Sequence, residues 1–182
     1  MYNFINMINI NSGDDIMKKI LPLLILFFTF GCSLTNTPSS KVEELLAKYQ
    51  MLDSDISSEI DIIIDKENLN DNQKEKYKQL IEKQYKNLSY EIKDEKIDGD
   101  TSTITVQIKV YDYKKTINEL NDEYSDKDYT LEEYNDEKIK RLENTNDTVT
   151  YTLELDVLKD KDGNWKLESL SNIDKKKLQG MY

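Results

Sequence analysis

Apolar residues recur every three or four positions over the first part of the domain, a period that predicts helices. Three such segments follow one another, at residues 41–52, 54–66 and 71–88. Each begins after residues that favour an N-cap: Ser39 or Ser40, Asp53 or Ser54, and Asn70 or Asp71. The predicted inner faces consist of Val42, Leu45, Leu46, Tyr49 and Leu52, then Ile56, Ile60 and Ile63, then Tyr77, Leu80, Ile81, Gln84, Tyr85 and Leu88.

After residue 88 the apolar period changes to two, which predicts strands with one buried face. A strand at 89–97 and another at 101–113 are joined at Asp98 and Gly99, a pair typical of tight hairpin turns. A second hairpin follows, with strands at 148–159 and around Trp165 and Leu167. The residues expected to face inward are Ile104, Val106, Ile108 and Val110, then Val149, Tyr151, Leu153, Leu155 and Val157.

Residues 114–147, between the two hairpins, return to helical spacing. We expect one broken helix or two short helices there, with Ile117, Leu120 and Tyr124, then Leu131, Tyr134, Ile139 and Leu142 on their apolar sides. The pattern therefore predicts an α+β fold: N-terminal helices on a four-stranded antiparallel sheet, with a helical insertion between the two hairpins.

Ahead of the domain, an apolar run at 20–30 follows a short basic start at Met17, Lys18 and Lys19 and leads to Gly31 and Cys32. About eleven residues are too few to cross a bilayer as a helix. A basic start, a short apolar run and a small residue are typical of an export signal. Residues 17–31 resemble the signal peptide of bacterial lipoproteins, and the resemblance implies cleavage before Cys32 and acylation of its thiol.

Residues 1–16 do not fit a signal peptide, because Asp14 and Asp15 are acidic where the start of a signal should be basic. We expect that translation begins at Met17. Residues 32–40 are small and polar, with one proline, which predicts a flexible tether. Residues 41–182 then form a single α+β domain, a suitable length for one hydrophobic core.

Composition narrows the functions that this domain can have. The chain holds 25 Lys and Arg against 36 Asp and Glu, a net charge of -11 that repels phosphate backbones and makes nucleic acid an unfavourable partner. It has no histidine, the commonest general base and transition-metal ligand. Its only cysteine is Cys32, so no disulfide can form within the chain. We expect no cofactor and no metal.

The order of elements, with the closing sequence "DGNWKLESL", resembles nuclear transport factor 2-like and cystatin-like domains over residues 41–181. It is similar to small surface lipoproteins of Gram-positive bacteria that carry such a domain. The resemblance implies a cone-shaped pocket between sheet and helices. Enzymes of that architecture pair an Asp base with a Tyr, and here the candidates with inward parity are Asp112 and Tyr151.

Two other clusters are candidates for binding. "DKDGN", residues 160–164, suggests a calcium loop, but Gly163 and Glu168 fall at the wrong positions, so a hairpin turn explains it better. Tyr111 and Tyr113 have outward parity on the strand at 101–113 and are candidates for an interaction surface.

We therefore expect a lipid-anchored, extracytoplasmic, non-enzymatic protein that serves as a binding or scaffolding domain for an unknown protein, peptide or small ligand. The alternative is a cofactor-free isomerase or hydrolase that uses Asp112 and Tyr151. A closed space between sheet and helices, filled by apolar side chains, favours binding or scaffolding through the outer surface, and an open one with Asp112 beside Tyr151 favours catalysis.

Overall fold

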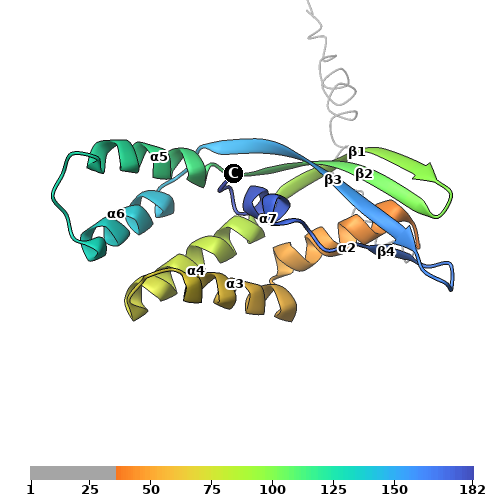
Figure 1. Ribbon diagram of the computed structural model, residues 1–182, viewed down its shortest axis with the longest axis horizontal. Helices are drawn as coiled ribbons and strands as arrows, with labels where there is room; N and C mark the ends of the chain where they lie inside the picture. The colour runs from red at the N-terminus through yellow and green to blue at the C-terminus, as the bar shows by residue number, and fades with distance from the viewer. Residues whose placement is uncertain (1–35) are drawn as a thin grey trace, which may run out of the picture. The chain divides into compact units, whose positions relative to one another are not determined.

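The structure is a computed structural model that describes residues 36–182 of the chain. These residues form an α+β domain with a four-stranded antiparallel sheet in the order β1-β2-β3-β4, so the predicted fold class and the two hairpins are confirmed (Figure 1). Residues 1–16, the signal at 17–31 and Cys32 lie outside the described residues. Between residues 36 and 182, no helix combines the length and the apolar character that a membrane span requires.

The elements follow the predicted order and add one helix at the end. The helices are α2 (Pro38–Met51), α3 (Ser54–Lys66), α4 (Asp71–Lys86), α5 (Tyr113–Tyr124), α6 (Leu131–Glu143) and α7 (Asn172–Leu178). The strands are β1 (Ser89–Asp98), β2 (Thr101–Tyr111), β3 (Thr148–Lys159) and β4 (Trp165–Leu167). The helical insertion is thus two helices, α5 and α6.

The core lies between one face of the sheet and helices α2 to α4, which Figure 1 shows together on one side of it. Helix α2 contacts all four strands. Alternate residues of β2 and β3 contribute to this core. Ile104 of β2 lies opposite Leu155 of β3 and Val106 opposite Leu153, and these four side chains are buried. The space between the sheet and the helices that cover it is therefore filled by apolar side chains.

The start of α2 corrects the predicted tether at 32–40. The helix begins at Pro38, and its N-cap is Thr37, not Ser39 or Ser40. The Thr37 hydroxyl accepts a hydrogen bond from the Ser40 amide, and proline is favourable in the first turn because its missing N–H needs no partner. Residues 33–35 of the predicted tether lie outside the described range.

Asn36 fastens the beginning of the domain to the turn between β3 and β4. Its Oδ1 accepts a hydrogen bond from the Trp165 amide at 2.9 Å. Its Nδ2 donates to Asn164 Oδ1 at 3.2 Å and to the Gly163 carbonyl at 3.4 Å. The chain therefore enters the domain at the β3–β4 end of the sheet.

Strand β2 ends two residues earlier than predicted, because Asp112 starts a helix. The Asp112 carboxylate accepts a hydrogen bond from the Lys115 amide at 2.9 Å, which makes it the N-cap of α5. Tyr113 is consequently the first residue of a helix rather than a strand residue. The first hairpin turn also lies one residue later than predicted, at Gly99 and Asp100.

Helix α7 was not predicted, since Leu178 is its only buried residue and no apolar stripe marks it. The helix ends in a Schellman motif: the Gly180 amide donates to the Lys177 carbonyl and the Met181 amide to the Lys176 carbonyl. Gly180 has a positive φ of 68° and its carbonyl accepts from the Lys114 amide at 2.8 Å. This contact docks the C-terminal segment against the start of α5.

One core hydroxyl is left without a partner. Ser102, on the inner face of β2 opposite Val157, is 2% exposed, and its Oγ has no hydrogen-bond partner among the described residues. A buried polar group without a partner opposes folding.

We therefore expect Ser102→Ala to raise the free energy of unfolding by up to about 1 kcal/mol. Urea denaturation followed by circular dichroism measures it. Ser58→Ala, which alters an exposed serine on α3 bonded to the Ser54 carbonyl, is the control and should change stability by less than about 0.5 kcal/mol. A clear loss of stability in Ser102→Ala would mean that the hydroxyl has a partner after all.

Candidate functional site

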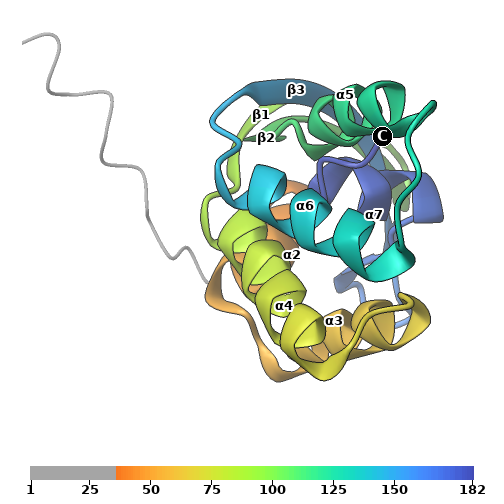
Figure 2. The same cartoon turned by 90° about the vertical axis from the view of Figure 1, so that its left-hand side faces the viewer.

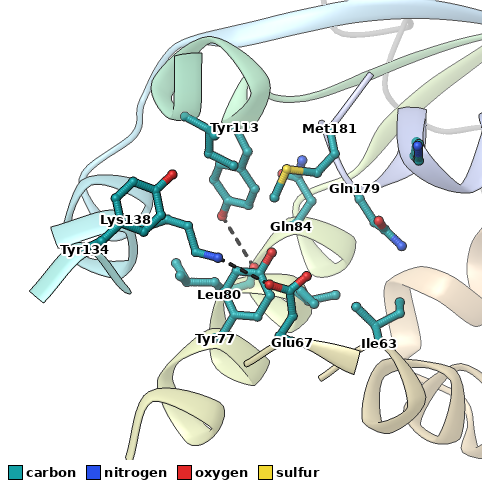
Figure 3. Close-up of a pocket in the computed structure, with 13 residues that line it drawn as sticks. Ile63, Glu67, Tyr77, Leu80, Gln84, Tyr113, Tyr134, Lys138, Gln179 and Met181 are labelled. Atoms are coloured by element: carbon teal, nitrogen blue, oxygen red, sulfur yellow. Dashed lines mark hydrogen bonds and ion pairs between the residues drawn. The ribbon is translucent and has the colours of Figure 1, made fainter. Parts of the chain in front are cut away.

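A cavity of about 310 Å³ lies among the helices, away from the sheet (Figure 3). Its lining comes from α3 to α7 and from the residues that directly follow α3 and α7. Figures 1 and 2 place α6 beside α4, and these two helices are in contact. The cavity is therefore distinct from the expected cone between sheet and helices.

The most buried charge in the lining is the ammonium group of Lys138, on α6. Lys138 is 9% exposed, and its Nζ lies 3.3 Å from Oε2 of Glu67, the residue that follows α3. The same Nζ lies 4.9 Å from the centre of the Tyr77 ring on α4, a cation–π contact. The ammonium group carries three N–H donors, and with one directed to Glu67 and one to the Tyr77 ring, one donor is left.

Polar contacts from α6 to the first turn of α4 and to the loop before it hold Lys138 in this position. The side-chain nitrogen of Gln73, Nε2, donates to Asp136 Oδ1 at 2.8 Å and to the Glu132 backbone carbonyl at 3.2 Å. The side-chain nitrogen of Asn135, Nδ2, donates to the Asn68 backbone carbonyl at 2.9 Å. Gln73 and Asn135 are both buried, so these contacts fix α6 against α4.

Two buried tyrosines supply hydroxyl groups to the lining. Burial, followed by the charge of Glu67, raises the pKa of Tyr77 above its ordinary value. Burial also raises the pKa of Tyr113, whose hydroxyl points to the Leu80 carbonyl at 3.4 Å (Figure 3). Both hydroxyl groups therefore stay protonated at neutral pH and can donate hydrogen bonds.

The C-terminal segment closes another side of the cavity, with Lys176, Gln179 and Met181 in the lining. It packs against the end of β2, where the Gln84 side chain of α4 accepts a hydrogen bond from the Tyr111 amide and donates one to the Tyr111 carbonyl, both at 3.0 Å. A β-carbon on Gly180 would lie 2.0 Å from the same Tyr111 carbonyl oxygen. Only glycine permits this close approach of residue 180 to Tyr111, and the approach positions the C-terminal segment beside the cavity.

Asp112 and Tyr151, the candidate catalytic pair, both have local partners at the end of the sheet. Asp112 caps α5, and the Tyr151 hydroxyl donates to the Tyr182 carbonyl at 2.9 Å. They are near enough that the Asp112 charge, after burial, contributes to raising the pKa of Tyr151. Neither of them lines the cavity.

The structure separates Tyr111 and Tyr113, the candidates for an interaction surface. Tyr113 is 1% exposed, so its predicted outward position is wrong: it belongs to a helix and packs in the core. Tyr111 is half-buried and stacks on Tyr113 with ring centres 6.1 Å apart. Lys83 Nζ lies 5.1 Å from the centre of the Tyr111 ring. Of the pair, Tyr113 lines the cavity and Tyr111 does not.

The charged residues of the cavity were not singled out from the sequence. The position of Lys138 could have indicated that its side chain is buried, because it lies four residues after Tyr134 and four before Leu142, on the apolar stripe of α6. A lysine at such a position must either pair or face a cavity. Within residues 36–182, no group of three or more Cys, Asp or Glu side chains is placed to hold a metal ion.

No protein-family model, no curated protein and no solved structure matches this chain. The functional argument therefore rests on the chemistry of the cavity and on the sequence that precedes the domain.

Proposed function

We propose that this chain is a non-enzymatic binding protein, anchored by lipids on Cys32 at the outer face of the cytoplasmic membrane, whose helix-lined cavity takes a small ligand. The observation that carries the binding role is the Lys138 ammonium group, which is buried in the lining with one carboxylate neighbour. Burying a charge is unfavourable, and ligand sites place a few such polar groups among apolar walls.

The anchor is proposed from the sequence. Lys18 and Lys19, the apolar run at 20–30 and Gly31 all precede the only cysteine of the chain. One acyl chain gives only marginal membrane binding, at about 0.8 kcal/mol per buried methylene, whereas two or more hold a protein stably. Diacylation of the Cys32 thiol, as in bacterial lipoproteins, would therefore suffice as an anchor.

Binding is favoured over catalysis because of where the polar groups lie. The space between sheet and helices is filled, and Asp112 and Tyr151 each hold a contact with the backbone. The finer fold assignment, a nuclear transport factor 2-like domain, is part of the proposal. Three leading helices on one face of a sheet in the order β1-β2-β3-β4 support it, although the cavity lies among helices rather than in a cone.

Phase partitioning of the full-length protein, expressed in a bacterium that processes lipoproteins, tests the anchor. We expect the mature protein in the detergent phase of Triton X-114, with an acylated Cys32 as its first residue by mass spectrometry. Cys32→Ser should carry no acyl group by mass spectrometry, because no other residue carries a thiol.

Ser33→Ala is the matched control, since it changes the neighbouring residue and keeps the thiol. It should partition like the wild type. An unacylated Cys32 in the mature protein, or an acyl group on the Cys32→Ser variant, would refute the anchor.

A further inference from the structure

The cavity is positively charged in a strongly acidic chain. Its charged lining residues are Lys138, Lys176 and Glu67, two positive and one negative, whereas the whole chain carries a net charge of -11. Lys138 and Glu67 form a pair at 3.3 Å, so the excess positive charge belongs to Lys176. A single negative charge on a ligand would neutralise the lining.

Lys176 differs from the two lysines beside it on α7. Lys175 pairs with Glu59 at 2.9 Å, and Lys177 pairs with Asp174 at 3.5 Å. Lys176 has no ion-pair partner among residues 36–182, and it is the one of the three that lines the cavity. The other two lysines are thus paired, whereas Lys176 is an exposed residue that borders the cavity without an ion-pair partner among the described residues.

The Tyr77 hydroxyl is a second donor without a partner. Tyr77 is 6% exposed, and its hydroxyl makes no hydrogen bond to a described residue, in contrast to Tyr113 and Tyr134. In the described part of the chain only Ser102 Oγ is both fully enclosed and unpaired, so the Tyr77 oxygen keeps access to open space. Tyr77 is one of the residues that line the cavity.

The rest of the lining is largely apolar. It comes from five helices or their ends and includes Ile63, Leu80, Ile81, Ile117 and Met181. A cavity of about 310 Å³ is at the small end of the range of ligand sites. Hydrogen-bond donors and aliphatic side chains in the same lining suit a small molecule with an acceptor group and a short hydrocarbon part.

We infer that the cavity binds a small amphipathic monoanion, a carboxylate on a short aliphatic chain, with Lys138, Lys176 and the Tyr77 hydroxyl donating to the carboxylate. The inference rests on the proposed binding function and specifies its ligand. One charge fits better than two, because the lining has a surplus of one positive charge and Glu67 would repel a dianion.

Isothermal titration calorimetry with four probes tests the inference. The acylated full-length protein is held in nanodiscs of zwitterionic phosphatidylcholine, and empty nanodiscs give the blank. The probes are hexanoate, the neutral hexanamide, the cationic hexylammonium and acetate, which has the head group without the chain. We expect hexanoate to bind at least about tenfold more tightly than each of the others, as one charge-assisted contact is worth roughly that factor.

Three variants locate the binding. Lys138→Met should weaken hexanoate about tenfold, and Tyr77→Phe and the more exposed Lys176→Met about threefold each, with little effect on hexanamide. Lys176→Met and Tyr77→Phe break no hydrogen bond or ion pair with a described residue, so they are informative even if Lys138→Met unfolds the protein. Lys175→Met makes the same charge change one residue away, outside the lining, and should leave the affinity unchanged.

The outcomes separate this inference from the proposed function. If hexanamide or hexylammonium binds as tightly as hexanoate, the cavity is a ligand site but the anionic ligand is wrong. If Lys175→Met weakens hexanoate as much as Lys176→Met does, the anion binds by general surface attraction and the inference fails. If none of the four probes binds, both the inference and the role proposed for the cavity are refuted.

Discussion

Gly180→Ala should lower the free energy of unfolding by about 3 kcal/mol. An alanine β-carbon would lie 2.0 Å from the Tyr111 carbonyl oxygen and 2.4 Å from Gln84 Nε2, so backbone must move. The left-handed conformation at φ 68° adds about 1 kcal/mol for a residue with a side chain, and forcing atoms into a packed site costs about 1–3 kcal/mol. Urea denaturation followed by circular dichroism measures the loss.

Gly163→Ala is the matched control for this substitution. Gly163 also has a positive φ, 81°, but a β-carbon there would meet nothing within 4 Å. It should cost only the conformational part, about 1 kcal/mol. Equal losses in the two variants would show that the close approach of Gly180 to β2 does not hold the C-terminal segment.

Gln84→Leu should lower the free energy of unfolding by about 2–6 kcal/mol. The Gln84 side chain is 1% exposed and pairs with both the amide and the carbonyl of Tyr111. Leucine has a similar size but leaves both backbone groups without their partner, and each such group costs about 1–3 kcal/mol. The same urea titrations measure the change.

Gln79→Leu, on the exposed side of the same helix, should change stability by less than about 0.5 kcal/mol. Gln84→Glu separates the two bonds: a carboxylate still accepts from the Tyr111 amide but repels the Tyr111 carbonyl. Its folded-state pKa should therefore be raised, and the variant should gain stability relative to wild type as the pH falls. A cost for Gln84→Leu no larger than for Gln79→Leu would show that these hydrogen bonds contribute little.

The sequence predicted most of the fold because each long element has one clear apolar period. The helices α3 and α4 begin at the residues expected from their caps, after Asp53 and Asn70. On α3, Ile63 was predicted to face the core, but it is half-buried and the next residue, Ile64, is buried instead. The prediction failed at Tyr111 to Tyr113, where the strand period of β2 gives way to the helical period of α5. The alternation of the strand continues by chance into the first residue of the helix, so the sequence did not indicate that Asp112 is the N-cap of α5.

The cavity could not be predicted from the sequence, for a different reason. Its lining is gathered from residues 63 to 181, and none of its polar residues forms a motif with its neighbours along the chain. Lys138 and Glu67 lie 71 residues apart. Their pairing depends on α6 folding back onto α4, a long-range contact that local spacing does not encode.

The Asn36 hydrogen bonds limit how far the domain can stand from a membrane. If Cys32 carries the proposed lipids, four residue steps separate it from Asn36, which span at most about 14 Å of extended chain. The proposed tether would therefore be short and would join the domain at the β3–β4 turn, whereas α6 precedes the other end of β3 (Figure 1). A ligand would have to reach the protein next to the bilayer, because the protein could not travel outward to meet it.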